Sequence, residues 1–204
     1  KGAVINNIVK ELREHGNALT AGDIGFRYLL QVLEDAGRSD VIFDMNSRDD
    51  VPGYGYQLAH GATSLTESWG ALPSVSNNHL MLGHLMEWFY SGLAGIRPAA
   101  GAIAFNKIEI RPEPVGDVTY VKANYQSPYG NIASNWKKSK DSFELNVVIP
   151  PNTTGMVYLP VSKTAGLRVN GQPVSARKDI KSSGYQNGKM KLAIGSGTYS
   201  FVAK

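Results

Sequence analysis

The sequence contains no cysteine among its 204 residues. Disulfide bonds, zinc–thiolate sites and cysteine nucleophiles are therefore excluded. No apolar run approaches the roughly 20 residues that a membrane-spanning helix needs, so we expect no membrane partner. Charged residues make up only 19% of the chain and hydrophobic residues 42%, which is typical of a globular protein somewhat poor in charge.

The chain also has no strong excess of one charge, since its formal net charge is +4. The lysines that gather in the C-terminal third are spread between strand-like segments: Lys137, Lys138, Lys140, Lys178, Lys181, Lys189 and Lys191. Such spacing favours solvated strand edges and turns over a basic groove. We therefore expect no nucleic-acid partner.

The first ~95 residues have apolar side chains at helical spacing. The apolar residues of this half fall in four segments, at Val4–Leu12, Phe26–Leu33, Val41–Met45 and Asn78–Leu93. The last is apolar around most of its circumference, which predicts a buried helix. An irregular stretch, Arg48–Asn77, separates it from the third segment, and irregular stretches of this length are often functional.

The period changes to two near residue 100. Strands are predicted at Phe105–Arg111, Thr119–Tyr125, Ile132–Lys137, Phe143–Ile149, Gly155–Leu159, Gly166–Val169, Lys189–Ile194 and Gly197–Val202. Asn170-Gly171 is a strong hairpin signal. We predict an α+β chain of segregated domains, with helical hairpins over residues 1–98 and an antiparallel β-sandwich over residues 99–204.

Within the irregular stretch, the carboxylate of Glu67 lies two residues before Trp69. A carboxylate can transfer a proton or activate a water molecule, and an indole can pack on the apolar face of a pyranose. The pair is therefore typical of a site that cleaves a sugar. Ser64 and Glu67 also have the spacing of a capping box. That alternative requires a helix to follow, and Gly70 and Pro73 interrupt one within about two turns.

A histidine close by, His79, opens the last apolar segment within plausible reach of Glu67. The alternative for a single histidine is a capping or core residue. Aromatic and hydrogen-bonding surface of the kind that sugars use is added by Tyr54, Tyr56, His60 and Trp69. The residues alone thus offer Glu67 as a candidate catalytic carboxylate and Trp69 and Tyr56 as candidate sugar-binding residues, with no cofactor or metal, and they leave the role of His79 open.

Several motifs in order resemble the C-terminal portion of bacterial α-L-rhamnosidases, glycoside hydrolase family 78. They are GATSLTESW, the Asn78-His79 pair, WFYSGLAGI, FNKIEIRPEP and VKANYQSPYGNIASNW. The resemblance implies the end of an (α/α)6 barrel followed by a β-sandwich, and hydrolysis of terminal α-L-rhamnosyl groups with inversion. It implies that Glu67 is the general base and that His79 and Trp69 line the rhamnose subsite. Thr66 and Ser68 depart from the family, where many members have Trp and Arg.

The general acid of that family lies in an Asp-Glu-Arg motif upstream of this region, and the string does not occur here. Asp49 and Asp50 match no acid position of the family. We therefore expect a fragment that supplies the base, binds rhamnose-containing glycosides or polysaccharides as part of a larger enzyme, and is inactive alone. Its truncated barrel would expose apolar helix faces, which predicts self-association.

Two other functions remain open at this point. The β-half could be an independent carbohydrate-binding module that uses Tyr120, Tyr125, Tyr129 and Trp136. The chain could also belong to an (α/α)6 glycosidase of another specificity, since a fold does not fix a function.

Overall fold

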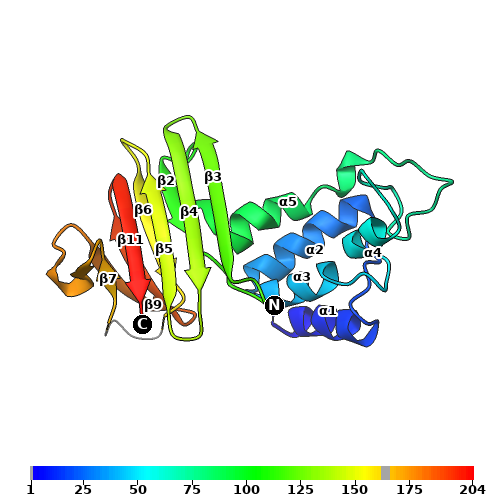
Figure 1. The fold of residues 1–204 in the computed structure, drawn as a ribbon, viewed down its shortest axis with the longest axis horizontal. Coiled ribbons are helices and arrows are strands. Elements are labelled where there is room, and N and C mark those ends of the chain that lie inside the picture. The colour runs from blue at the N-terminus through cyan, green and yellow to red at the C-terminus, as the bar shows by residue number, and fades with distance from the viewer. Residues whose placement is uncertain (1, 162–165) are drawn as a thin grey trace. The chain divides into compact units, whose positions relative to one another are not determined.

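A computed structural model describes residues 2–161 and 166–204. The chain divides into two compact units, Lys1–Trp88 and Phe89–Lys204. Figure 1 shows helices throughout the first unit and strands through most of the second. The division precedes the boundary after residue 98 that the sequence suggested, and the assignment of residues 1–98 and 99–204 to two domains stays a prediction. Among the described residues, no helix combines the length and the apolar character needed to cross a membrane.

The first unit consists of helices joined by irregular segments. They are α1 (Gly2–Glu14), α2 (Asp23–Asp35), α3 (Ser39–Asn46), α4 (Tyr54–Ala59), the 3-10 helix η1 (Leu80–Leu82) and α5 (Leu85–Trp88). Helix α2 buries Phe26, Leu30 and Leu33, which recur at helical spacing on one face. The three helices expected from the first three apolar segments are confirmed.

The prediction of one buried helix over Asn78–Leu93 is wrong. The chain there forms η1, then α5, and the second unit begins with a π-helical turn, η2 (Phe89–Leu93). Leu80 is 80% exposed and Met86 57% exposed. Two local features interrupt the helix: the His79 N–H donates to the Leu65 carbonyl (2.8 Å), and Gly83 follows η1 as a weak helix former.

The second unit is a β-sandwich of two sheets. One sheet has the order β1 (Ile96–Pro98), β2 (Lys107–Ile110), β6 (Thr154–Leu159), β10 (Lys189–Ile194), β9 (Lys181–Gln186). The other has the order β3 (Tyr120–Ser127), β4 (Gly130–Lys138), β5 (Phe143–Ile149), β11 (Gly197–Ala203), β7 (Arg168–Val169), β8 (Gln172–Pro173). The expected class, a helical part followed by a sandwich, is confirmed.

One strand pair differs from the expected antiparallel pattern. Strands β2 and β6 pair in parallel, with Ile108 opposite Gly155. A parallel pair needs a long crossover connection, and here the chain between the two strands supplies β3, β4 and β5 to the other sheet. The Asn170-Gly171 hairpin is confirmed, because β7 and β8 pair across these two residues, which both have positive φ (50° and 78°).

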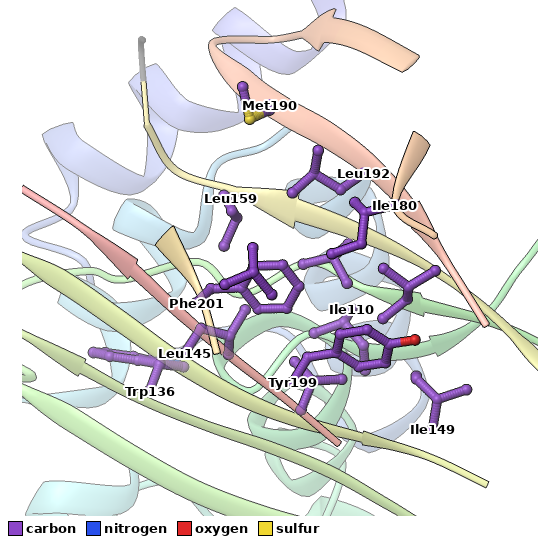
Figure 2. Packing of buried hydrophobic residues seen from close by; sticks show 14 of the residues in the cluster. Ile110, Trp136, Leu145, Ile149, Leu159, Ile180, Met190, Leu192, Tyr199 and Phe201 are labelled. Carbon is purple, nitrogen blue, oxygen red and sulfur yellow. The ribbon is translucent and has the colours of Figure 1, made fainter. Parts of the chain in front are cut away.

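The core of the sandwich lies between the two sheets (Figure 2). Alternate residues face inward most clearly in β5, where Leu145, Val147 and Ile149 are almost fully buried. Figure 2 shows Phe201 on β11 beside Leu145, with Leu192 on β10 across the core. These side chains are large and apolar. Because their surface is removed from water, their burial provides the main stabilisation of this unit.

A buried carboxylate in this unit, Glu113, is surrounded by three cations. Its Oε1 lies 3.6 Å from Arg111 Nη2, 3.7 Å from Lys189 Nζ and 4.0 Å from Arg97 Nη2. Burial of the ammonium lowers the pKa of Lys189 to about 8; Glu113 opposes the shift, and the two guanidiniums add to it. The folded state therefore holds the Lys189 proton less tightly than the unfolded chain does.

We expect this unit to become more stable above pH 8. Between about pH 8 and the usual lysine range the unfolded chain binds more protons than the folded one, so the free energy of unfolding rises with pH. The rise should be on the order of 2–3 kcal/mol. Urea unfolding between pH 7 and 10 measures it. Lys189→Met should abolish the rise and Lys191→Met, on the same strand, should keep it; an equal rise in both variants would contradict the assignment.

Candidate active site

The site nominated by the sequence lies in the first unit, where two short segments run beside each other. The Glu67 N–H donates to the Ser76 carbonyl (2.8 Å), and the His79 N–H donates to the Leu65 carbonyl (2.8 Å). The Ser64 hydroxyl donates to the Asn77 carbonyl. No helix begins at Ser64, so the capping-box alternative is wrong. We call the paired segments 64–69 and 75–79 the site hairpin.

The carboxylate of Glu67 is exposed. Its Oε2 accepts a hydrogen bond from the Ser76 N–H (3.1 Å), which orients the group on the site hairpin. In the part of the chain that the structure describes, Glu67 forms no ion pair. An exposed carboxylate with a fixed orientation has the geometry needed for a base that deprotonates water.

His79 is held on the opposite segment of the site hairpin. Its side chain is 19% exposed, and its Nε2 lies 3.3 Å from Oδ2 of Asp23. Asp23 begins α2 and accepts a second hydrogen bond from the Ile24 N–H (2.8 Å). That backbone hydrogen bond and the contact with His79 lower the pKa of the Asp23 carboxyl, against a smaller opposing effect of burial. Sequence reasoning missed Asp23, because an aspartate in the first turn is an ordinary helix-start signal.

Trp69 is buried, with 9% of its surface exposed. Its indole N–H donates to the Ala21 carbonyl (2.7 Å), and its ring packs edge-on against Phe26 (5.0 Å between centroids) and Tyr54 (5.1 Å). These contacts anchor the site hairpin to α2 and α4. The substrate-binding role of Trp69 stays a prediction, since the contacts named here are one hydrogen bond to the backbone and the packing of its ring.

The two tyrosines that open α4 differ in their surroundings. The hydroxyl of Tyr54 donates to the Leu82 carbonyl, and burial raises the pKa of Tyr54 to about 12. Tyr56 is half-buried and stacks on His60, with 3.8 Å between ring centroids and 22° between planes. The structure thus brings Glu67 and His79 together on one hairpin and places Tyr56 on a separate helix. Its role as a substrate-binding residue also stays a prediction.

The aromatic residues proposed for a carbohydrate-binding sandwich do not form one surface. Trp136 is only 2% exposed and donates its indole N–H to the Leu93 carbonyl (2.8 Å), so it belongs to the core. Tyr120, Tyr125 and Tyr129 are exposed, and the ring of Tyr125 also packs against Phe105 (4.8 Å between centroids). The inclusion of Trp136 in a sugar-binding face is therefore wrong.

Comparison with known proteins covers both units of the chain. Residues 1–93 match the model of the bacterial α-L-rhamnosidase 6 hairpin glycosidase domain, and residues 95–172 match that of the bacterial α-L-rhamnosidase C-terminal domain. The chain belongs to the bacterial α-L-rhamnosidase family. The order of the two models agrees with the helical and sandwich units of this family member and confirms the resemblance found in its sequence.

Individual α-L-rhamnosidases match over almost the whole chain. One from Formosa agariphila is 29% identical over 97% of this chain and 22% of its own length. One from Streptomyces avermitilis is 30% identical over 90% of this chain and 18% of its own length. The structure of Streptomyces avermitilis α-L-rhamnosidase complexed with L-rhamnose has a TM-score of 0.87 at 27% identity, covering 98% of this chain and 19% of that one. The structure of the α-L-rhamnosidase from Dictyoglumus thermophilum has a TM-score of 0.82 at 30% identity, and the match covers 94% of this chain and 22% of that one. The chain spans about a fifth of the length of these relatives.

Proposed function

We propose that this chain contributes the general base to an enzyme that removes terminal α-L-rhamnose from glycosides or polysaccharides with inversion. The base is Glu67. The observation that carries the proposal is the exposed Glu67 carboxylate, oriented by the Ser76 N–H on the same hairpin that holds His79. Membership of the α-L-rhamnosidase family supports the choice of sugar.

In the proposed reaction Glu67 takes a proton from a water molecule while the water oxygen bonds to the anomeric carbon. The glycosidic C–O bond breaks on the opposite face of the sugar, and a general acid protonates the departing oxygen. An inverting pair of carboxyl groups lies roughly 6.5–9.5 Å apart, which leaves room for the water. His79, Trp69 and Tyr56 are proposed to bind the sugar.

The general acid is proposed to lie outside this chain. Asp50, one of the two acidic residues in the loop before α4, is paired with Arg48 through hydrogen bonds of 2.8 and 2.5 Å. That pairing lowers the pKa of Asp50 and therefore favours its ionised form, which cannot donate a proton. The loop thus fits a structural ion pair better than a proton donor.

The anomeric configuration of the released rhamnose provides a direct test in the complete rhamnosidase that contains this segment. Proton NMR of an aryl α-L-rhamnoside during the first minutes of hydrolysis should show β-L-rhamnose before the anomers equilibrate. Initial release of α-L-rhamnose would contradict a base that activates water in a single displacement.

We also propose that the isolated chain self-associates through apolar surface of the first unit. Helix α1 has no buried residue, and the large apolar side chains exposed elsewhere in the unit include Ile24 (66%), Leu58 (71%) and Leu80 (80%). Burying such surface against a second copy is favourable by about 25 cal/mol per Å². Light scattering should show a mass that rises with concentration, and Ile24→Lys combined with Leu80→Lys should reduce it. A monomer at every concentration would count against the proposal.

A further inference from the structure

Among the described residues, the carboxylate of Asp23 contacts the imidazole of His79 from another element. The two residues are 56 positions apart in sequence, and Asp23 Oδ2 lies 3.3 Å from His79 Nε2. An ionised carboxylate can only accept hydrogen bonds. The hydrogen in this contact therefore belongs to Nε2 of the ring.

Both partners of this contact are fixed independently of it. Asp23 lies in the first turn of the 13-residue helix α2, and its Oδ1 accepts from the Ile24 N–H (2.8 Å). The backbone of His79 is tied to the Leu65 carbonyl (2.8 Å) on the site hairpin. The imidazole thus has one anchored end at its backbone and another at Nε2, which leaves little freedom for the ring to turn.

A neutral imidazole with its hydrogen on Nε2 has a lone pair on Nδ1. We propose that Asp23 is a positioning residue that holds His79 in this tautomer, so that Nδ1 accepts a hydrogen bond from a hydroxyl group of the bound sugar. The sugar-binding part rests on the function proposed above, whereas the tautomer rests on the contact alone. The arrangement follows the general pattern in which a carboxylate behind a histidine fixes the tautomer and orientation of the ring.

A second histidine, His84, also acts on Asp23 and must be distinguished from His79. It contributes electrostatically to the lowered pKa of the Asp23 carboxyl, and its own Nδ1 is buried without a hydrogen-bond partner among the described residues. The hydrogen bond to the carboxylate comes from His79. A test therefore has to resolve the two rings separately.

Nitrogen-15 NMR of the histidine side chains in the 204-residue chain provides that resolution. At neutral or higher pH and low temperature, the neutral ring of His79 should carry its proton on Nε2, and this proton should exchange slowly with water. Asp23→Ala should remove the slowly exchanging signal. Asp35→Asn, an exposed change at the other end of α2, should leave it in place. A proton on Nδ1 of His79 would overturn the proposal. So would a slowly exchanging Nε2 proton that stays unchanged in Asp23→Ala.

Asp23→Asn serves as the second variant if Asp23→Ala fails to fold, since the asparagine oxygen can still accept from the Ile24 N–H. In the complete rhamnosidase, Asp23→Asn should raise KM for an aryl α-L-rhamnoside roughly tenfold, with a smaller change in kcat. Combined with His79→Ala it should add little to the effect of His79→Ala alone, because the carboxylate acts through the ring.

Additive effects in that double-variant cycle would overturn the role of Asp23 as a positioning residue. A confirmed Nε2 proton together with an unchanged KM in both single variants would support the tautomer and contradict the sugar contact assigned to His79. That second result would be a failure of the proposed function and not of the Asp23–His79 contact.

Discussion

Replacement of Glu67 by glutamine in the complete rhamnosidase is expected to lower kcat for an aryl α-L-rhamnoside by about 10²–10⁴-fold. The amide cannot accept a proton from water, so the attacking nucleophile loses its activation. The amide oxygen can still accept the hydrogen bond from the Ser76 N–H, which keeps the site hairpin in place. The loss should therefore appear in kcat, with KM changed much less.

The experiment needs a control of equal charge change away from the site. Glu14→Gln fits this purpose, because Glu14 lies at the end of α1 in an exposed pair with Lys10 (3.7 Å). Both variants should have the circular dichroism spectrum and melting temperature of the unmodified protein. Activity of Glu67→Gln within about fivefold of the control would remove Glu67 as the base.

Local patterns in the sequence predict most of the secondary structure. The strand Phe143–Ile149 has the same bounds in the sequence prediction and in the structure, because its buried and exposed residues alternate without interruption. Strand β9 (Lys181–Gln186) was missed, since all six of its residues are exposed and carry no apolar alternation. Short β1 and β8 lack enough residues to show a period.

Arrangements that depend on distant segments are less accessible to sequence reasoning. The parallel pairing of β2 with β6 joins residues such as Glu109 and Met156, and nothing in either strand alone specifies its direction. The prediction of one buried helix over Asn78–Leu93 was wrong for a related reason. The apolar composition of this segment predicts burial, but a backbone hydrogen bond between His79 and Leu65 and the glycine at position 83 decide its conformation.

The residues of the candidate site also differ in how far the sequence predicts them. Glu67 and His79 are close in sequence, and a hairpin between them brings both into one place. Asp23 belongs to a distant helix and enters the site only through the tertiary fold. The contact between the Trp69 ring and Phe26 was likewise not predicted from the sequence, and the sugar-binding role that the neighbouring carboxylate suggests for Trp69 stays a prediction.

The isolated 204-residue chain is expected to hydrolyse an aryl α-L-rhamnoside at less than about a hundredth of the rate of the complete enzyme. The function proposed for Glu67 supplies only one of the two carboxyl groups that inversion requires. Asp50, one of the two acidic residues in the loop before α4, is paired with Arg48, which lowers the pKa of its carboxyl and favours the ionised form. Departure of a poor leaving group without a proton is the step that should fail.

The choice of leaving group separates two causes of this inactivity. A rhamnoside with a strongly activated aryl group needs little help from an acid, so part of the lost rate should return if the chain binds sugar and lacks only the proton donor. Any rate that returns must disappear in Glu67→Gln and persist in Glu14→Gln. Turnover of an unactivated rhamnoside by the isolated chain, within about tenfold of the complete enzyme, would place the acid inside these residues and contradict the division of roles proposed here.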